Sequence, residues 1–116
     1  MNILIVDDEK DALEVMEFFI SQYGGVDSCV PCRNAFEALE QAAKTSFDIA
    51  LLDIEMPVMN GLELAESLLT LSPHMKIAFI TAYNHYATEA FEVNAIDYIK
   101  SFYAENCIFS LVIIKL

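Results

Sequence analysis

The chain has 116 residues, 56% of them hydrophobic, which fits one domain with a single core and leaves no room for two. Its formal net charge of −12 repels nucleic acid phosphate, so we expect no direct binding to DNA or RNA. No apolar stretch approaches the roughly 18 residues of a membrane span, and no signal-like segment opens the chain, so we expect a cytoplasmic protein with no membrane contact.

Apolar runs typical of strands alternate with segments of helical periodicity through most of the chain. In chain order, these segments cover residues 2–6, 11–22, 26–31, 35–44, 48–52, 62–71, 76–80, 85–93 and 96–99. Such alternation predicts an α/β fold in which helices cover both faces of a parallel sheet. A capping-box pattern from Asn34 to Glu37, the Gly24-Gly25 pair and the Asn60-Gly61 turn agree with these boundaries.

Carboxylates follow two of the predicted strands. Asp7 and Asp8 come directly after the first apolar strand, and Asp53 comes directly after the apolar run Ile-Ala-Leu-Leu of residues 49–52. Because the carboxyl ends of parallel strands meet at one edge of the sheet, we expect these side chains to converge there. Packed together they would repel one another unless a cation held them, and oxygen-only ligands suit Mg²⁺. A metal beside a carboxylate is also what phosphoryl transfer to that carboxylate needs.

Cys29 and Cys32 have the CxxC spacing of redox and zinc sites, but they fall in a predicted strand rather than at a helix N-terminus. Positions three apart on a strand face opposite sides of the sheet. We therefore expect structural thiols, with redox or zinc chemistry as the alternatives.

The chain resembles the response regulator receiver domains of two-component signalling, also called CheY-like domains. The resemblance rests on Val-Asp-Asp-Glu ending at Glu9, Asp-Ile-Glu-Met-Pro beginning at Asp53, Ile-Thr-Ala around Thr81 and Asp-Tyr-Ile-Lys ending at Lys100. Residues 86–98 are most similar to receivers that precede LytTR-type or related transcriptional effector domains. The resemblance implies a flavodoxin-like, doubly wound five-stranded sheet of order 2-1-3-4-5.

The resemblance also implies a role for each matching residue. Asp53 would be the phosphoacceptor, served by a sensor histidine kinase, and Mg²⁺ would be held by Asp7, Asp8, Asp53 and the backbone carbonyl of Glu55. Thr81 and Lys100 would bind phosphoryl oxygens, and Tyr98 would change rotamer when Thr81 is drawn to the phosphate. Metal, ammonium and hydroxyl together neutralise the charge of an acyl phosphate.

The C-terminal end departs from this pattern. Lys100 lies two residues after Tyr98 where receivers of this group have three, and Ser101 replaces the usual proline. Because side chains alternate along a strand, Tyr98 and Lys100 cannot both keep their usual places. We therefore divide the chain into a receiver domain, residues 1–100, and an atypical apolar tail, residues 101–116. A fifth helix is doubtful there, and we expect a homodimer through residues 108–114, since exposed apolar side chains favour association.

Together with the acidic edge, the resemblance implies a phosphoacceptor signalling switch that uses Mg²⁺ and is not a metabolic enzyme. One alternative is a phosphatase of the haloacid dehalogenase kind, but neither acidic motif has the required DxD pattern. The other is a degenerate receiver that serves as a dimerisation or protein-binding module, which the shortened fifth strand and the tail favour.

Overall fold

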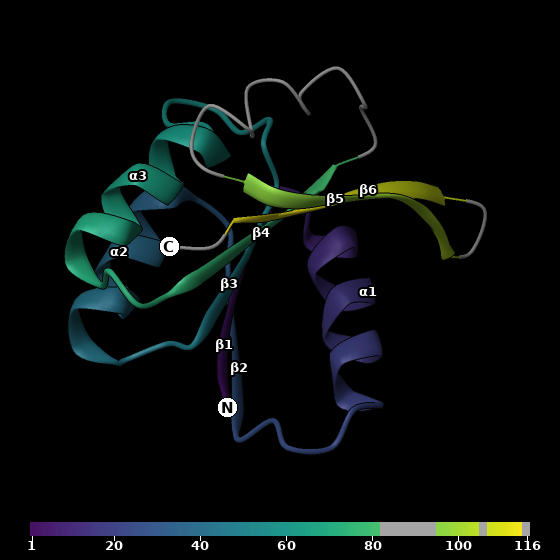
Figure 1. Cartoon of the computed structure of the whole chain (residues 1–116), viewed down its shortest axis with the longest axis horizontal. Helices are drawn as coiled ribbons and strands as arrows, with labels where there is room; N and C mark the ends of the chain where they lie inside the picture. The colour runs from purple at the N-terminus through teal and green to yellow at the C-terminus, as the bar shows by residue number, and fades with distance from the viewer. Residues whose placement is uncertain (82–94, 105–106, 115–116) are drawn as a thin grey trace.

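The computed structural model describes the backbone of residues 1–81, 95–104 and 107–114 and the side chains of residues 1–79. Its elements, in chain order, are β1 (Asn2–Val6), α1 (Lys10–Ser21), β2 (Ser28–Cys32), α2 (Ala35–Lys44), β3 (Ile49–Leu52), α3 (Gly61–Leu71), β4 (Lys76–Thr81), β5 (Ala95–Ala104) and β6 (Cys107–Ile114). Figure 1 shows the strands as one twisted sheet between helices. The α/β fold is confirmed.

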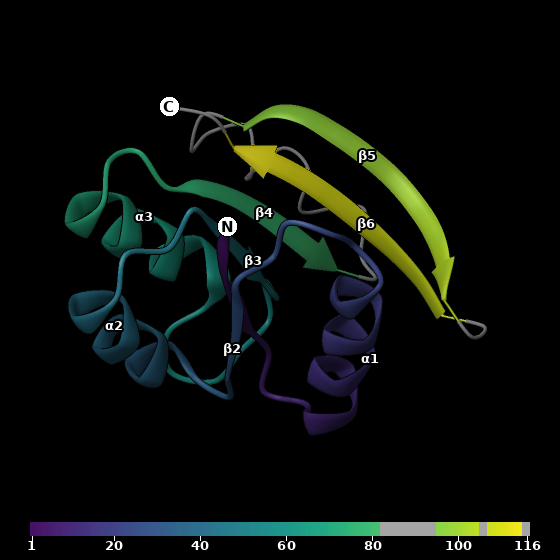
Figure 2. The same ribbon diagram turned by 90° about the horizontal axis from the view of Figure 1, so that it is seen from below.

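The first four strands form a parallel sheet of order β2-β1-β3-β4. Their side chains alternate between two cores: Leu4 and Val6 pack beneath α2 and α3, whereas Ile3 and Ile5 pack beneath α1. Figure 2 shows α1 on one side of the sheet and α2 with α3 on the other. Burial on both faces explains why these strands are continuously apolar, and it brings all four carboxyl ends to one edge.

Side-chain caps fix where α2 and α3 begin. At α2, Asn34 accepts a hydrogen bond from the Glu37 amide at 2.8 Å, while the Glu37 carboxylate accepts from the Arg33 amide at 2.9 Å. The predicted capping box is therefore formed with its return bond displaced by one residue. At α3, Asn60 and Glu63 form the complete reciprocal box, where only a turn was expected.

The CxxC pair lies in β2 on opposite faces of the sheet, as predicted. Cys32 is buried in the core beneath α2 and α3, and Cys29 packs with the α1 core. Burial raises the pKa of the Cys32 thiol to about 11 and also raises that of Cys29, so both thiolates are disfavoured. These properties support structural thiols.

The C-terminal part differs from the five-stranded order 2-1-3-4-5. The place beside β4 is held by β6, which runs antiparallel to it, and β5 lies outside β6 at the edge of the sheet. Part of the apolar tail is thus a strand, and β5 itself runs through Lys100 and Ser101. An antiparallel hairpin satisfies the backbone of an apolar segment that has no polar helical face.

Two further expectations concern other parts of the chain. The helix predicted over residues 85–93 lies outside the described residues. Among those that are described, no helix combines the length and apolar composition needed to cross a bilayer. The division into residues 1–100 and 101–116 stays a prediction.

Candidate functional site

Asp7 and Asp8 are placed by the end of β1. The Asp7 amide donates to the Cys32 carbonyl at 3.1 Å, which extends the pairing of β1 with β2 by one residue. The Asp7 carboxylate then accepts a hydrogen bond from the Glu9 amide at 2.9 Å, just before α1 begins at Lys10. A short, internally bonded loop therefore holds two consecutive carboxyl groups at the sheet edge.

Asp53 reaches the same edge from β3. Its amide donates to the Val6 carbonyl at 2.9 Å, so the backbone of Asp53 is tied to the strand that carries Asp7. The following loop returns at once, because the Gly61 amide donates to the Ile54 carbonyl at 2.8 Å. A Cβ at Gly61 would lie only 2.1 Å from the Asp53 carbonyl oxygen, so glycine is required for this approach.

Asp7, Asp8 and Asp53 form one acidic cluster, with one carboxylate oxygen of each within 4.8 Å of the others. Burial, followed by the charges of Asp7 and Asp8, raises the pKa of Asp53 from 3.8 to about 7. Burial is also the main reason why the pKa of Asp7 rises to about 6. The cluster is therefore costly to ionise near neutral pH unless a cation is present.

The donor set fits a hard divalent cation. All three groups are carboxylates, they converge from two strands, and no cysteine or histidine is among them. Mg²⁺ prefers such oxygen ligands and keeps several waters in an octahedral shell, so a partial set of protein ligands suffices. The same cation would offset the repulsion that raises the pKa values of Asp7 and Asp53.

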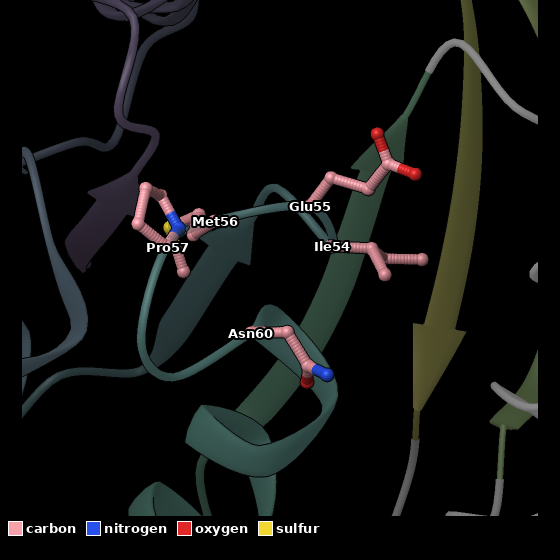
Figure 3. A pocket seen from close by; sticks show the side chains of 5 residues that line it. All are labelled: Ile54, Glu55, Met56, Pro57 and Asn60. Atoms are coloured by element: carbon pink, nitrogen blue, oxygen red, sulfur yellow. The ribbon is translucent and has the colours of Figure 1, made fainter.

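A cavity of about 390 Å³ lies along the loop between β3 and α3, the loop that begins at Asp53. Figure 3 shows its lining: Ile54, Glu55, Met56, Pro57 and Asn60. The side chains of Ile54 and Glu55 extend on one side of the loop, and Met56 and Pro57 lie on the other. The cavity is thus lined by hydrophobic side chains together with one carboxylate, that of Glu55, and one amide, that of Asn60.

The backbone of this loop is strained at Val58. Its φ of 71° lies in the left-handed region, which a β-branched residue adopts at a cost, and its side chain is 87% exposed. No burial of Val58 offsets that cost. The strained conformation is therefore imposed by the backbone path between Asp53 and Gly61, and not by packing of the Val58 side chain.

The structure brings together Asp7, Asp8 and Asp53, and Glu55 lies in the loop two residues after Asp53. Thr81 ends β4, while Tyr98 and Lys100 lie on β5; the side chains of all three are outside the described part. The roles assigned to these residues stay predictions.

Sequence reasoning missed two residues at this edge. The Asn60-Gly61 pattern predicts only a turn, although a glycine at the start of a helix, eight residues after Asp53, is also a signal of close backbone approach. Arg33 was not singled out at all; its guanidinium donates to the Asp8 carbonyl at 3.1 Å. Its position two residues after the end of the predicted second strand, residues 26–31, was the available signal.

Comparison with known proteins agrees with this geometry. The family model described as response regulator receiver domain matches residues 3–111. Among curated proteins, an uncharacterized response regulatory protein of Yersinia pestis is 42% identical over 85% of this chain and 41% of its own length. The sensory transduction protein LytT of Enterococcus faecalis is 39% identical over 91% of this chain and 44% of its own. The chain thus spans about two fifths of the length of these relatives.

Among solved structures, the response regulator TrrA of Thermotoga maritima, determined in complex with Mg²⁺-BeF, is 34% identical to this chain. The match has a TM-score of 0.70 and covers 76% of this chain and 75% of that one. The predicted resemblance to receiver domains, most similar to those that precede LytTR-type or related effector domains, is confirmed. The flavodoxin-like fold class is confirmed as well, with the first four strands in the order 2-1-3-4.

Proposed function

The chain belongs to the response regulator receiver domain family, and on that premise we propose that it is a two-component phosphorylation switch in which Asp53 accepts a phosphoryl group from a sensor histidine kinase. The observation that carries the proposal is the convergence of Asp7 and Asp8 with Asp53 at the carboxyl edge of the sheet. Transfer would break the bond between phosphorus and the donor's imidazole nitrogen and form one to an Asp53 carboxylate oxygen. Because the proposed partner is a sensor histidine kinase, the proposal also includes a cytoplasmic location for this chain.

We propose that Asp7, Asp8, Asp53 and the Glu55 carbonyl hold Mg²⁺, which when bound supplies charge neutralisation for the acceptor and the phosphoryl oxygens. Asp53 itself must be ionised to act as the nucleophile, and its raised pKa makes that state depend on a neighbouring cation. Thr81 and Lys100 would contact phosphoryl oxygens, and Tyr98 would report the phosphorylated state. The output of the switch would be transcriptional and indirect, through further protein segments.

A second candidate is a signalling-impaired receiver that binds another protein or a second copy of itself. It is favoured by the register shift of β5 between Ile99 and Phe102, next to the shortened motif, and by the hairpin that β5 forms with β6. In this candidate the acidic cluster could still bind Mg²⁺, but Asp53 would not be phosphorylated. A homodimer through residues 108–114 is part of this proposal.

Incubation with acetyl phosphate and Mg²⁺ tests the first candidate. Intact and peptide mass spectrometry should show one added phosphoryl group on the parent protein, dependent on Mg²⁺, and none on Asp53→Asn. Asp48→Asn is a matched control, because Asp48 precedes the same strand at the other end. Failure to label the parent, with Mg²⁺ binding intact, would favour the second candidate; hydrolysis of p-nitrophenyl phosphate would instead indicate a phosphatase.

Mg²⁺ binding is tested separately by calorimetry or by NMR titration. We expect weak binding that Asp8→Ala abolishes, because the cluster offers few protein ligands and loses one of them. Equal affinity in the parent and in Asp8→Ala would remove Asp8 from the site. Analytical ultracentrifugation of the parent protein tests the homodimer: a dimer would support it, and a stable monomer would contradict it.

A further inference from the structure

Arg33 joins two loops at the acidic edge. Its Nη2 donates to the Asp8 carbonyl at 3.1 Å, across 25 residues of sequence. The pairing of β1 with β2 ends at Val6 opposite Cys32, so Arg33 follows directly on β2 as Asp7 follows on β1. The contact therefore lies at the point where the loop that carries two of the three clustered carboxylates leaves the sheet.

The setting of Arg33 differs from that of an ordinary surface cation. Among the described residues, the ion pairs are those of the chain's first amino group with Asp27 and of Lys44 with Glu40, and none involves Arg33. The guanidinium instead bonds a backbone carbonyl, although two carboxylates of the acidic cluster, those of Asp7 and Asp8, lie on the same loop. A bond to backbone constrains the path of the loop, whereas an ion pair to a side chain would constrain only that side chain.

The base of the Arg33 side chain is itself held. The Arg33 amide donates to the Glu37 carboxylate at 2.9 Å, within the cap of α2, and the neighbouring Cys32 carbonyl accepts from the Asp7 amide. The guanidinium thus extends from a fixed backbone to the Asp8 carbonyl. We propose that Arg33 is a positioning residue for the Mg²⁺ ligands: by tethering the Asp8 carbonyl it holds the loop of Asp7 and Asp8 in the conformation that binds the cation. This proposal rests on the metal site proposed above.

Two effects of removing Arg33 have opposite signs, which makes the proposal testable. As a nearby positive charge, Arg33 repels Mg²⁺, so its removal would strengthen binding. As a tether, it preorganises the ligands, so its removal would weaken binding. The direction of the change in affinity therefore distinguishes positioning from simple electrostatics.

The experiment compares Mg²⁺ affinity, measured by NMR titration at constant ionic strength, in the parent, Arg33→Met and Arg33→Lys. Methionine keeps an unbranched side chain but has neither the charge nor the donors, whereas lysine keeps the charge. Lys44→Met is the control, because it removes the same charge from the last turn of α2, at the far end of that helix from Arg33. We expect Arg33→Met to bind Mg²⁺ about threefold more weakly, the size of one solvated hydrogen bond, and Lys44→Met to bind as the parent does.

A second measurement needs no metal. The Glu9 amide, which donates to the Asp7 carboxylate, should exchange with solvent several times faster in Arg33→Met than in the parent or in Lys44→Met. Affinity equal to or tighter than the parent's in Arg33→Met, or unchanged exchange at Glu9, would overturn the positioning role. A parent that binds no Mg²⁺ would overturn the metal site of the proposed function, and the exchange measurement would still decide whether Arg33 tethers the loop.

Discussion

The two ends of β3 carry the same residue type in opposite surroundings. At the amino end, Asp48 is exposed, and its carboxylate accepts a hydrogen bond from the Asn2 amide at 2.7 Å. At the carboxyl end, Asp53 is half-buried beside two other carboxylates, and its pKa rises to about 7. The first aspartate is thus exposed and hydrogen-bonded, whereas ionisation of the second is disfavoured by burial and by its acidic neighbours, a cost that a bound cation would relieve.

Backbone strain is distributed in the same way. Gly25, in the turn between α1 and β2, adopts a φ of 84°, which costs glycine little. Val58, in the loop after Asp53, adopts a φ of 71° with a branched side chain. Strain and unrelieved charge thus both lie at the edge with the acidic cluster, a distribution that is common at functional sites.

Gly61→Ala should have the largest effect on stability and on labelling, if the contact between Gly61 and the Asp53 carbonyl is what positions Asp53 at the carboxyl edge. Its methyl group would lie 2.1 Å from the Asp53 carbonyl oxygen, so the loop must move. We expect a loss of roughly 2–3 kcal/mol in the free energy of unfolding, typical of overpacking, and loss of labelling at Asp53. Urea denaturation measures the first effect. Gly24→Ala is the control, because nothing lies within 4 Å of a Cβ there, and an equal loss in both variants would refute the argument.

Substitution of the two aspartates should affect stability in opposite directions in the metal-free protein at pH 7.5. Asp53→Asn removes a charge that is costly in the folded state, so it should raise the free energy of unfolding by about 1 kcal/mol after allowance for solvent screening. Asp48→Asn weakens the bond to the Asn2 amide and should lower it by about 0.5–1 kcal/mol. Chemical denaturation of both variants decides the matter, and the same sign in both would show that the two ends do not differ.

The stability of the metal-free protein should also fall as the pH rises from about 4 to about 7. In this window the folded protein keeps protons on Asp7 and Asp53 that the unfolded chain has already released, because both pKa values are raised from 3.8. Thermal unfolding across the window should show the decline. Mg²⁺ binds the folded state and should reverse it near pH 7.5, an effect that Asp8→Ala should remove.

The smallest expected effect concerns strain. Val58→Gly should stabilise the protein by about 0.5 kcal/mol, because relief of the left-handed conformation slightly exceeds the entropy cost of glycine and the side chain is already 87% exposed. Val58→Asn should do the same. Gly25→Ala, at the other edge, should destabilise by about 1 kcal/mol, since alanine disfavours a φ of 84°. Destabilisation by Val58→Gly would show that valine is not strained there.

The parts of the fold that follow from local pattern could be predicted from the sequence. Continuous apolar runs ending in Asp7 and Asp53 indicate buried parallel strands, and parallel strands bring those carboxylates together. The tether of Arg33 to the Asp8 carbonyl could not be predicted, because it depends on where two loops meet in space. The contact of Gly61 with the Asp53 carbonyl depends in the same way on the path of the loop.

The position of the tail, residues 101–116, could not be predicted from the local sequence pattern for a different reason. An apolar segment rich in β-formers can pair with its own sheet or with another molecule, and its composition is the same in both cases. The strand β6 pairs with β4 on one side and β5 on the other, which displaces β5 from the position that the order 2-1-3-4-5 assigned to it. The partners of a strand are thus set by the whole sheet rather than by the strand.

Pro31 limits the hydrogen bonding available along the outer side of β2, the strand at one lateral edge of the sheet. β2 is the edge strand there, and the Cys32 carbonyl points inward to accept from the Asp7 amide. Because backbone groups alternate in direction along a strand, the nitrogen of Pro31 faces outward, where it has no hydrogen to donate. A strand from another molecule that paired with β2 on this side would lack one backbone hydrogen-bond donor and would clash with the pyrrolidine ring. The proline thus acts as a terminator of intermolecular sheet growth without removing any bond within the molecule.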